Sequence, residues 1–267
     1  MSKKEIKAVE DHQNAMVAAG IDFAADAGQG MEGADAESFA IPFLAILQGL
    51  SPQIETVDGA KPGLLINTVT NELMTEAVIV PVAFARRYLR WGDRDAGEKG
   101  FRGEFLPSEV QKMLSTGEAY EEDRGRIRVR TEGARADDIL RDTRQHYVLI
   151  VSEDGTWTPA IMGLTSTMIK KSKNLMAQIS NFTMTSADGK RFNPPSFARK
   201  FRITTEKETN DHGTWYSPNF SVDGMVDDPQ LYEAAKAFHK QVATGEVIVD
   251  HDSAEGGREK ASDDEGF

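Results

Sequence analysis

Three short stretches place lysine or arginine beside aromatic or β-branched residues and a fourth groups three lysines, a combination suited to binding single-stranded nucleic acid. They are residues 84–91 (FARRYLRW), 124–130 (RGRIRVR), 190–202 (KRFNPPSFARKFR) and the lysines of 170–173 (KKSK). Cations follow the phosphates of a strand, while exposed bases stack on ring faces at about 1–3 kcal/mol per base, whatever the base. The chemistry that these residues suggest is binding without sequence preference.

Residue spacing in two of these stretches indicates which side chains would face a bound strand. In an extended chain, alternate residues project from one face, so all three arginines of RIRVR share a face. In ARRYLRW, Arg86, Tyr88 and Arg90 share one face and form the better candidate surface, while Trp91 lies on the other. The candidate nucleic-acid-binding residues are Arg86, Tyr88, Arg90, Trp91, Arg126, Arg128, Arg130, Lys170, Lys171, Lys173, Arg191, Phe192, Lys200, Trp215 and Tyr216.

A structural role is the alternative for each of these residues. Phe84, Trp157, Phe197 and Phe201 could belong to the core, and arginines on the outside of strands often pair with nearby acids. The grouping of cations into four clusters favours the binding interpretation.

The charge is distributed unevenly along the chain. The formal net charge is −12, but residues 1–40 contain three lysines and eight acids, and residues 245–267 contain two cations and eight acids. The remaining residues, 41–244, therefore carry a net charge of −1. A nearly neutral body between two acidic ends is compatible with nucleic-acid binding, which the total charge alone argues against.

The sequence offers little chemistry for catalysis. There is no cysteine, and phosphate-binding, dinucleotide-binding, nucleophile-elbow and zinc-protease motifs are all absent. The acidic pairs at 137–138 and 227–228 could hold Mg²⁺, but a charged loop and a helix start explain them better. We therefore expect no enzyme activity, no catalytic residue, no metal and no cofactor. The five histidines are scattered singly: His12, His146, His212, His239 and His251.

Strand and helix patterns begin at residue 39, after a leader rich in Ala, Gly and acids. Runs of apolar and β-branched residues separated by turns predict strands, including a hairpin around Asp154-Gly155. Helices are predicted from Ser108, over residues 165–181 with Met168, Leu175, Met176 and Ile179 on one side, and from Asp228 to Gly245.

At least seven β segments, two or three helices and no βαβ alternation predict a β-rich α+β fold. An OB-fold-like antiparallel β-barrel with helical insertions and disordered acidic termini is the expected architecture. We expect three parts: a mobile acidic leader (1–38), an OB-fold-like DNA-binding domain (39–244) and a disordered acidic tail (245–267). The domain is expected to contain an insertion near 92–142 and a C-terminal helix (228–244). No apolar run is long enough to span a membrane and no signal peptide is evident, so a cytoplasmic location is expected.

The tail ends in SDDEGF, an acidic cluster followed by an aromatic residue. With this ending the chain resembles the bacteriophage single-stranded DNA-binding proteins built on an OB-fold. The body is similar to phage proteins commonly labelled this way, over roughly residues 39–220, through IPFLAILQGLSPQI, GAKPGLLINTVTNEL, RRYLRW and LTSTMIKKSK. The resemblance implies that the tail docks on replication or recombination enzymes (polymerase, helicase or primase) and competes with DNA for the protein's own groove. The residues that would do so are Asp263, Asp264, Glu265 and Phe267.

We therefore expect a sequence-independent single-stranded DNA-binding protein of phage replication and recombination, with a possible homo-oligomeric state. The body is larger than a minimal OB domain, and Gly266 separates the acids from Phe267, which departs from the family's pattern. Three alternatives remain: a strand-annealing recombination protein, a structural or regulatory phage protein that does not bind DNA, and a metal-dependent nuclease.

Overall fold

A computed structural model describes residues 40–251 except 99, 123, 124 and 212, together with residues 17, 19–21, 23, 25–27 and 29–33. Two long antiparallel strands, β4 (Glu76–Trp91) and β8 (Asp138–Val151), form the centre of the fold. They pair from Val78 opposite Val151 to Trp91 opposite Ile139, with a register shift between Pro81 and Ala83. Proline cannot donate to a sheet ladder, which explains why the irregularity falls there.

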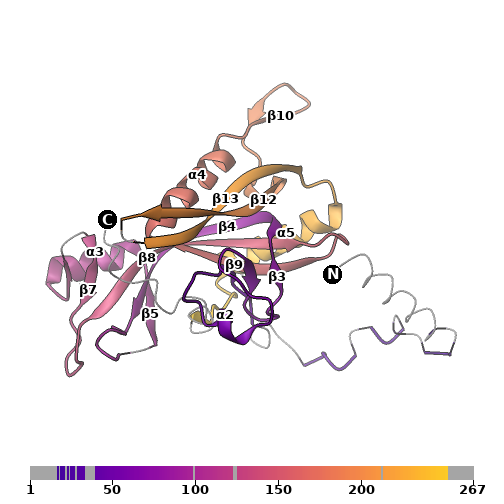
Figure 1. Cartoon of the computed structure of the whole chain (residues 1–267). Coiled ribbons are helices and arrows are strands. Elements are labelled where there is room, and N and C mark those ends of the chain that lie inside the picture. The colour runs from indigo at the N-terminus through magenta and orange to yellow at the C-terminus, as the bar shows by residue number, and fades with distance from the viewer. Residues whose placement is uncertain are drawn as a thin grey trace.

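Different strands flank the two halves of this central pair (Figure 1). At one end, β4 pairs with β12 (Arg199–Asn210), which pairs with β13 (Gly213–Met225), and β8 pairs with β9 (Trp157–Thr165). At the other end, β4 pairs with β5 (Phe101–Phe105), and β8 pairs with β7 (Ile127–Val129), which pairs with β6 (Ala119–Glu121). Helix α3 (Pro107–Thr116) lies at this second end. The expected insertion near 92–142 therefore contains β5, α3, β6, β7 and the start of β8.

The sheet is antiparallel and β-rich, as predicted, but it does not close into a barrel within the described residues. The strand order is β13-β12-β4-β8-β7-β6, and no pairing joins β13 to β6. Because β4 and β8 are long, β12 and β5 occupy successive stretches of the same edge of β4. The expected OB-fold barrel is therefore not confirmed.

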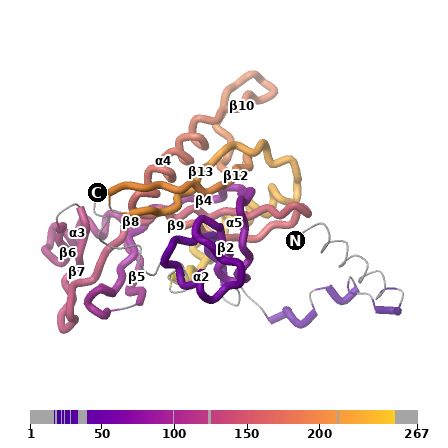
Figure 2. The backbone as a smooth tube through the Cα atoms, viewed as in Figure 1, coloured from indigo at the N-terminus to yellow at the C-terminus, as the bar shows by residue number. Residues whose placement is uncertain are grey.

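A small sheet packs against the main one. It consists of β1 (Leu44–Ile46), β2 (Leu65–Asn67) and β3 (Leu73–Met74), with the short helix α2 (Gln53–Thr56) in the connection (Figure 2). The Ile161 amide donates to the Pro42 carbonyl at 3.0 Å, and Phe43 forms a parallel bridge with Ile161 of β9. These contacts fix the small sheet over the main sheet.

Both faces of the central sheet are buried near the bulge, which explains the nearly continuous apolar run VIVPV in β4. Ile79 faces a cluster with β1, β2 and Leu175 of helix α4 (Ile169–Ser180), which follows a 3₁₀ turn at Ser166–Met168. Val80 faces the other cluster, with helix α5 (Pro229–Thr244). Phe197 and Phe201 are buried, in agreement with a core role for these two rings.

Helix α5 begins and ends where its sequence signals predict. The Asp228 side chain accepts hydrogen bonds from the amides of Gln230 (2.7 Å) and Leu231 (3.4 Å), and Pro229 occupies the first turn. Gly245 ends the helix with φ 77°, a left-handed conformation that glycine adopts easily. No helix among the described residues is long and apolar enough to cross a membrane.

The chain continues along the body after α5, which differs from the prediction that the tail is unfolded from Gly245. Val247 and Val249 pack against the cluster that includes α5, Ile248 is exposed, and His251 is buried. We call residues 246–251 the strap. The rest of the tail lies outside the described residues.

Candidate nucleic-acid interface

One segment, residues 169–203, is rich in cations and poor in acids. It contains eight lysines and arginines and a single acid, Asp188, in a chain whose net charge is −12. The segment forms α4, the small hairpin of β10 (Met184–Thr185) and β11 (Arg191–Phe192), a 3₁₀ turn (Ser196–Ala198) and the start of β12. Figure 1 shows α4 leading to this hairpin, which projects from the body. This segment is the strongest candidate for contact with phosphates.

Helix α4 is fixed to the body on one side and exposes lysines on the other. Leu175 is fully buried, and the Ser172 hydroxyl lies 2.7 Å from Nε2 of buried His146 on β8. Lys170 and Lys173 are exposed and share a face at i, i+3 spacing. Lys171 faces elsewhere, because its ammonium pairs with the carboxylates of Glu206 and Glu208.

The β10–β11 hairpin, which follows α4 in the chain, carries an exposed ring. Met184 and Phe192 are directly opposed across the hairpin and are 37 % and 43 % exposed. Arg191, opposite Thr185, is also exposed. Because consecutive strand residues face opposite sides, the Met184–Phe192 pair lies on one face of the hairpin and Arg191 on the other. The hairpin thus offers a ring for stacking on one face and a cation for phosphates on the other. We call Lys170, Lys173, Arg191 and Phe192 the α4–hairpin surface.

The arginines of β4 and β7 are paired with acids instead. Arg86 binds both carboxylate oxygens of Asp142, with Nε–Oδ1 at 3.1 Å and Nη2–Oδ2 at 2.7 Å. Arg90 Nε lies 2.6 Å from Oδ2 of fully buried Asp138. Arg128 pairs with Asp93 and with Glu122.

Charge pairing is strong enough to shift the pKa values of these groups. Burial favours the neutral form of Asp93, but the hydrogen bond and charge of Arg128 outweigh it and lower the pKa of Asp93. The pKa of Arg86 is raised, chiefly by its hydrogen bond to Asp142. Both pairs therefore remain charged at neutral pH and hold β4, β7 and β8 together.

The other candidate residues have structural contacts or scattered positions. Tyr88 and Trp91 are buried, and the Arg86 guanidinium donates to the Tyr88 hydroxyl at 2.8 Å. Neither ring presents a face to solvent in this structure.

Lys200 pairs with Asp227, Arg130 lies over the Tyr120 ring, and Trp215 Nε1 donates to Ser217. Partly buried Arg126 lies at the end of β7, away from the α4–hairpin surface, and the Tyr216 ring packs against Gly63. The acidic tail residues Asp263, Asp264, Glu265 and Phe267 lie outside the described residues.

One aromatic contact near this surface was not singled out from the sequence. The Arg199 guanidinium lies 4.3 Å from the centroid of the Phe182 ring, which connects the start of β12 to the loop after α4. A guanidinium over a ring face is a favourable cation–π pair. The two residues are 17 positions apart, so the sequence gives no local signal for this contact.

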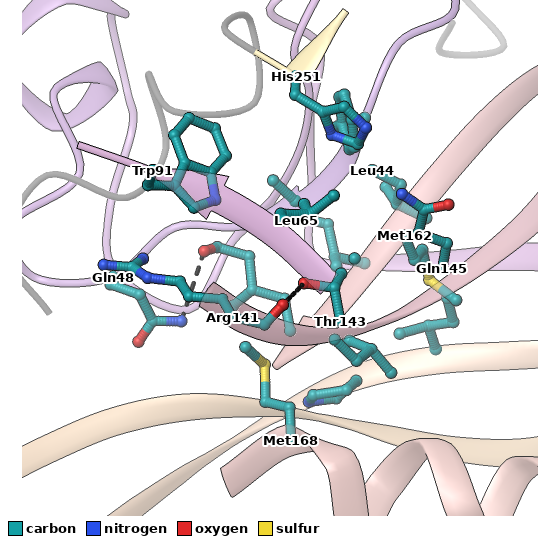
Figure 3. A pocket seen from close by; sticks show the side chains of 18 of the residues that line it. Leu44, Gln48, Leu65, Trp91, Arg141, Thr143, Gln145, Met162, Met168 and His251 are labelled. Carbon is teal, nitrogen blue, oxygen red and sulfur yellow. Dashed lines mark hydrogen bonds between the residues drawn. The ribbon is translucent and has the colours of Figure 1, made fainter. Parts of the chain in front are cut away.

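A cavity of about 70 Å³ lies between the small sheet and the main sheet (Figure 3). Its wall is mainly apolar, with Leu44, Leu65, Trp91 and Met162 among its residues. The polar residues that line it are Gln48, Arg94, Arg141, Thr143, Gln145 and His251. Except for Trp91, none of these lining residues was predicted to be functional, because they come together only through the packing of distant strands. No group of three or more His, Asp or Glu side chains able to hold a metal ion occurs in the described part of the chain.

Comparison with known proteins gives one relationship. A family model described as "Pam3 phage gp34-like protein" matches residues 10–248. The chain belongs to this family. It is therefore a phage protein, which agrees with the phage part of the resemblance seen in the sequence. No curated protein matches the chain, and neither does any solved structure.

Proposed function

We propose that the protein binds single-stranded DNA without sequence preference, through the α4–hairpin surface. The observation that carries this proposal is the segment 169–203, where eight cations accompany one acid and where Lys170, Lys173, Arg191 and Phe192 are exposed together. Lysines spaced along a helix match a row of phosphates, and Phe192 offers a ring for stacking. The proposal does not require a closed OB-fold barrel.

The proposal includes a non-enzymatic role in phage DNA replication and recombination, in the cytoplasm of the host. The protein would protect single strands, while the acidic tail, including Asp263, Asp264, Glu265 and Phe267, would recruit replication enzymes. A chain truncated after His251 tests the tail: it should tighten DNA binding and lose partner capture. Truncation at this point keeps the strap that packs on the body.

A second candidate function is that of a structural or regulatory phage protein that does not bind DNA. The pairing of Arg86, Arg90 and Arg128 with carboxylates favours it, because these arginines are already neutralised within the fold. Such a protein would show no affinity for DNA even at low salt.

Fluorescence anisotropy of a labelled oligonucleotide separates the two functions. We expect binding to the single strand, much weaker binding to the corresponding duplex, and an affinity that falls steeply with salt. Absence of binding to the single strand at low salt would contradict the proposal and support the structural role.

A further inference from the structure

The ring of His251, at the end of the strap, lies in a slot that it shares with two aromatic side chains, tilted by 38° from the Phe101 ring and by 48° from the Phe43 ring. Its centroid lies 4.6 Å from that of Phe101 and 6.0 Å from that of Phe43. Its Nε2 lies 2.9 Å from Oε2 of Glu104, and the residue is 4 % exposed. The slot therefore combines ring faces with a carboxylate acceptor at its base.

The charge state of Glu104 determines which hydrogen bond the slot makes. Burial opposes ionisation of this carboxyl, but hydrogen bonds from His251 and Gln145 outweigh burial and lower its pKa. Oε1 also accepts from Arg87 Nε at 2.7 Å, and Oε2 accepts from Gln145 Nε2 at 3.0 Å. An ionised carboxylate only accepts, so Nε2 of His251 carries the proton. The slot is thus built to hold a planar ring that points an N–H at Glu104.

The strap can leave the slot without breaking a sheet. Residues 246–250 belong to no strand in the described structure, and Val247, Val249 and His251 are among the strap residues that contact the body. Ile248 between them is 58 % exposed. Displacing the strap would cost side-chain contacts rather than a ladder of backbone hydrogen bonds.

The slot adjoins the 70 Å³ cavity, which His251 also lines. Nδ1 of His251 is buried and has no hydrogen-bond partner among the described residues. Trp91, Arg94 and Arg141 line the same cavity. Departure of the imidazole would join slot and cavity into a space bordered by aromatic rings, a carboxylate and two guanidinium groups.

We propose that this slot is a binding site for a planar nitrogen heterocycle with an N–H donor, which His251 occupies within the chain and which an external ring can enter in its place. A nucleobase has this chemistry: its faces stack on aromatic rings, and its edge carries N–H donors. The inference does not depend on single-stranded DNA binding at the α4–hairpin surface.

Chemical complementation of the full chain tests the slot. In His251→Ala, imidazole should bind at least tenfold more tightly than it does to the wild type, as measured by calorimetry at a pH where imidazole is neutral. His239→Ala is the matched control and should show no gain, because His239 contacts the Val82 carbonyl elsewhere. 1-Methylimidazole, which has no N–H, should bind His251→Ala at least tenfold more weakly than imidazole. Equal binding of the two probes, or no binding of imidazole to folded His251→Ala, would overturn the proposal.

Nucleosides test the ligand class in the same assay. Cytidine should bind His251→Ala, and N4,N4-dimethylcytidine, which lacks the exocyclic N–H donors, should bind several-fold more weakly. If His251→Ala does not fold, hydrogen exchange of the wild type decides: millimolar cytidine should speed exchange in the strap but not in α5. Failure of cytidine in both experiments would overturn the assignment to nucleobases.

Discussion

Arg90 on β4 and Asp138 at the start of β8 form an ion pair, with Nε and Oδ2 2.6 Å apart and the carboxylate fully buried. Arg102 of β5 approaches the other carboxylate oxygen at 3.0 Å, so Asp138 connects β4, β5 and β8. Arg90 thus stabilises the end of the sheet that carries β5 and β7, and its guanidinium is not available to a ligand without giving up its contact with buried Asp138.

Substitution Asp138→Asn should destabilise the protein strongly. It leaves Arg90 and Arg102 without the carboxylate between them, and breaking a buried pair costs about 3–5 kcal/mol. Asp188→Asn is the matched control: it removes an exposed pair with Lys190 and should destabilise the protein far less. Urea denaturation of the two variants measures the difference, and equal costs would contradict the structural role of Asp138.

Gly63 should not tolerate a side chain, because the ring of Tyr216 packs against it. Its φ is 91°, and a Cβ there would lie 2.6 Å from Cε1 of Tyr216. Gly133→Ala is the control, with φ 75° and open space around the added carbon. Both variants carry backbone strain of about 1 kcal/mol, but Gly63→Ala should lose about 1–3 kcal/mol more through the clash. Thermal or urea denaturation should rank the two in this order, and the reverse order would contradict the docking of the small sheet on β13.

His146 should make stability depend on pH between about 6.5 and 4. Burial of the ring, together with the nearby positive charge of Arg144, lowers the pKa of His146 from 6.5 to about 4. The unfolded chain then binds the proton more readily than the folded one, so this contribution is fully present above pH 6.5 and is lost as pH falls to 4. The loss amounts to about 3 kcal/mol, at 1.36 kcal/mol per pH unit.

Urea denaturation at several pH values checks this contribution. Between pH 6.5 and 4, His146→Gln should lose less stability than the wild type. Both proteins retain all the carboxylates, so the difference between them reports on His146 alone. Titration of the His146 ring near its ordinary pKa, observed by NMR, would contradict the burial of the ring.

Lys171 and Lys173 should differ in their effect on DNA binding although they are two residues apart. Lys171 is held by Glu206 and Glu208, while Lys173 is exposed on the α4–hairpin surface. Lys173→Ala should therefore weaken single-strand binding and reduce its salt dependence, and Lys171→Ala should change the salt dependence little. Anisotropy titrations of the two variants make this comparison, and an equal effect would place the interface elsewhere.

Much of the local structure could be predicted from the sequence, because its signals are local. Asp228 with Pro229 and Gly245 marked the ends of α5, and Asp154-Gly155 marked the turn between β8 and β9. On α4, buried Leu175 has Met168 and Ile179 packed against the same cluster, as their spacing predicted. Ile127 and Val129 of RIRVR indeed form a strand.

The partners of the cations could not be predicted in this way. Arg90 and Asp138 are 48 positions apart, and Arg128 and Asp93 are 35 apart, so only strand pairing brings them together. Alternation predicted Arg86, Tyr88 and Arg90 on one face, and Arg86 does contact Tyr88. It could not show that β5, β7 and α3 pack at this end of the sheet. The sequence likewise did not show that different strands pair with the two halves of β4 and β8.

The most direct test of the account is the salt dependence of single-strand binding by Lys170→Ala/Lys173→Ala/Arg191→Ala. Its control is Lys112→Ala/Lys236→Ala/Lys240→Ala, which makes the same charge change at exposed positions of α3 and α5. Each phosphate contact with a single strand releases about 0.7 counterions, so loss of three contacts should make the slope of log K against log salt less negative by about 2. The control variant should leave the slope unchanged. Equal slopes for the two variants would contradict the α4–hairpin surface as the site of binding.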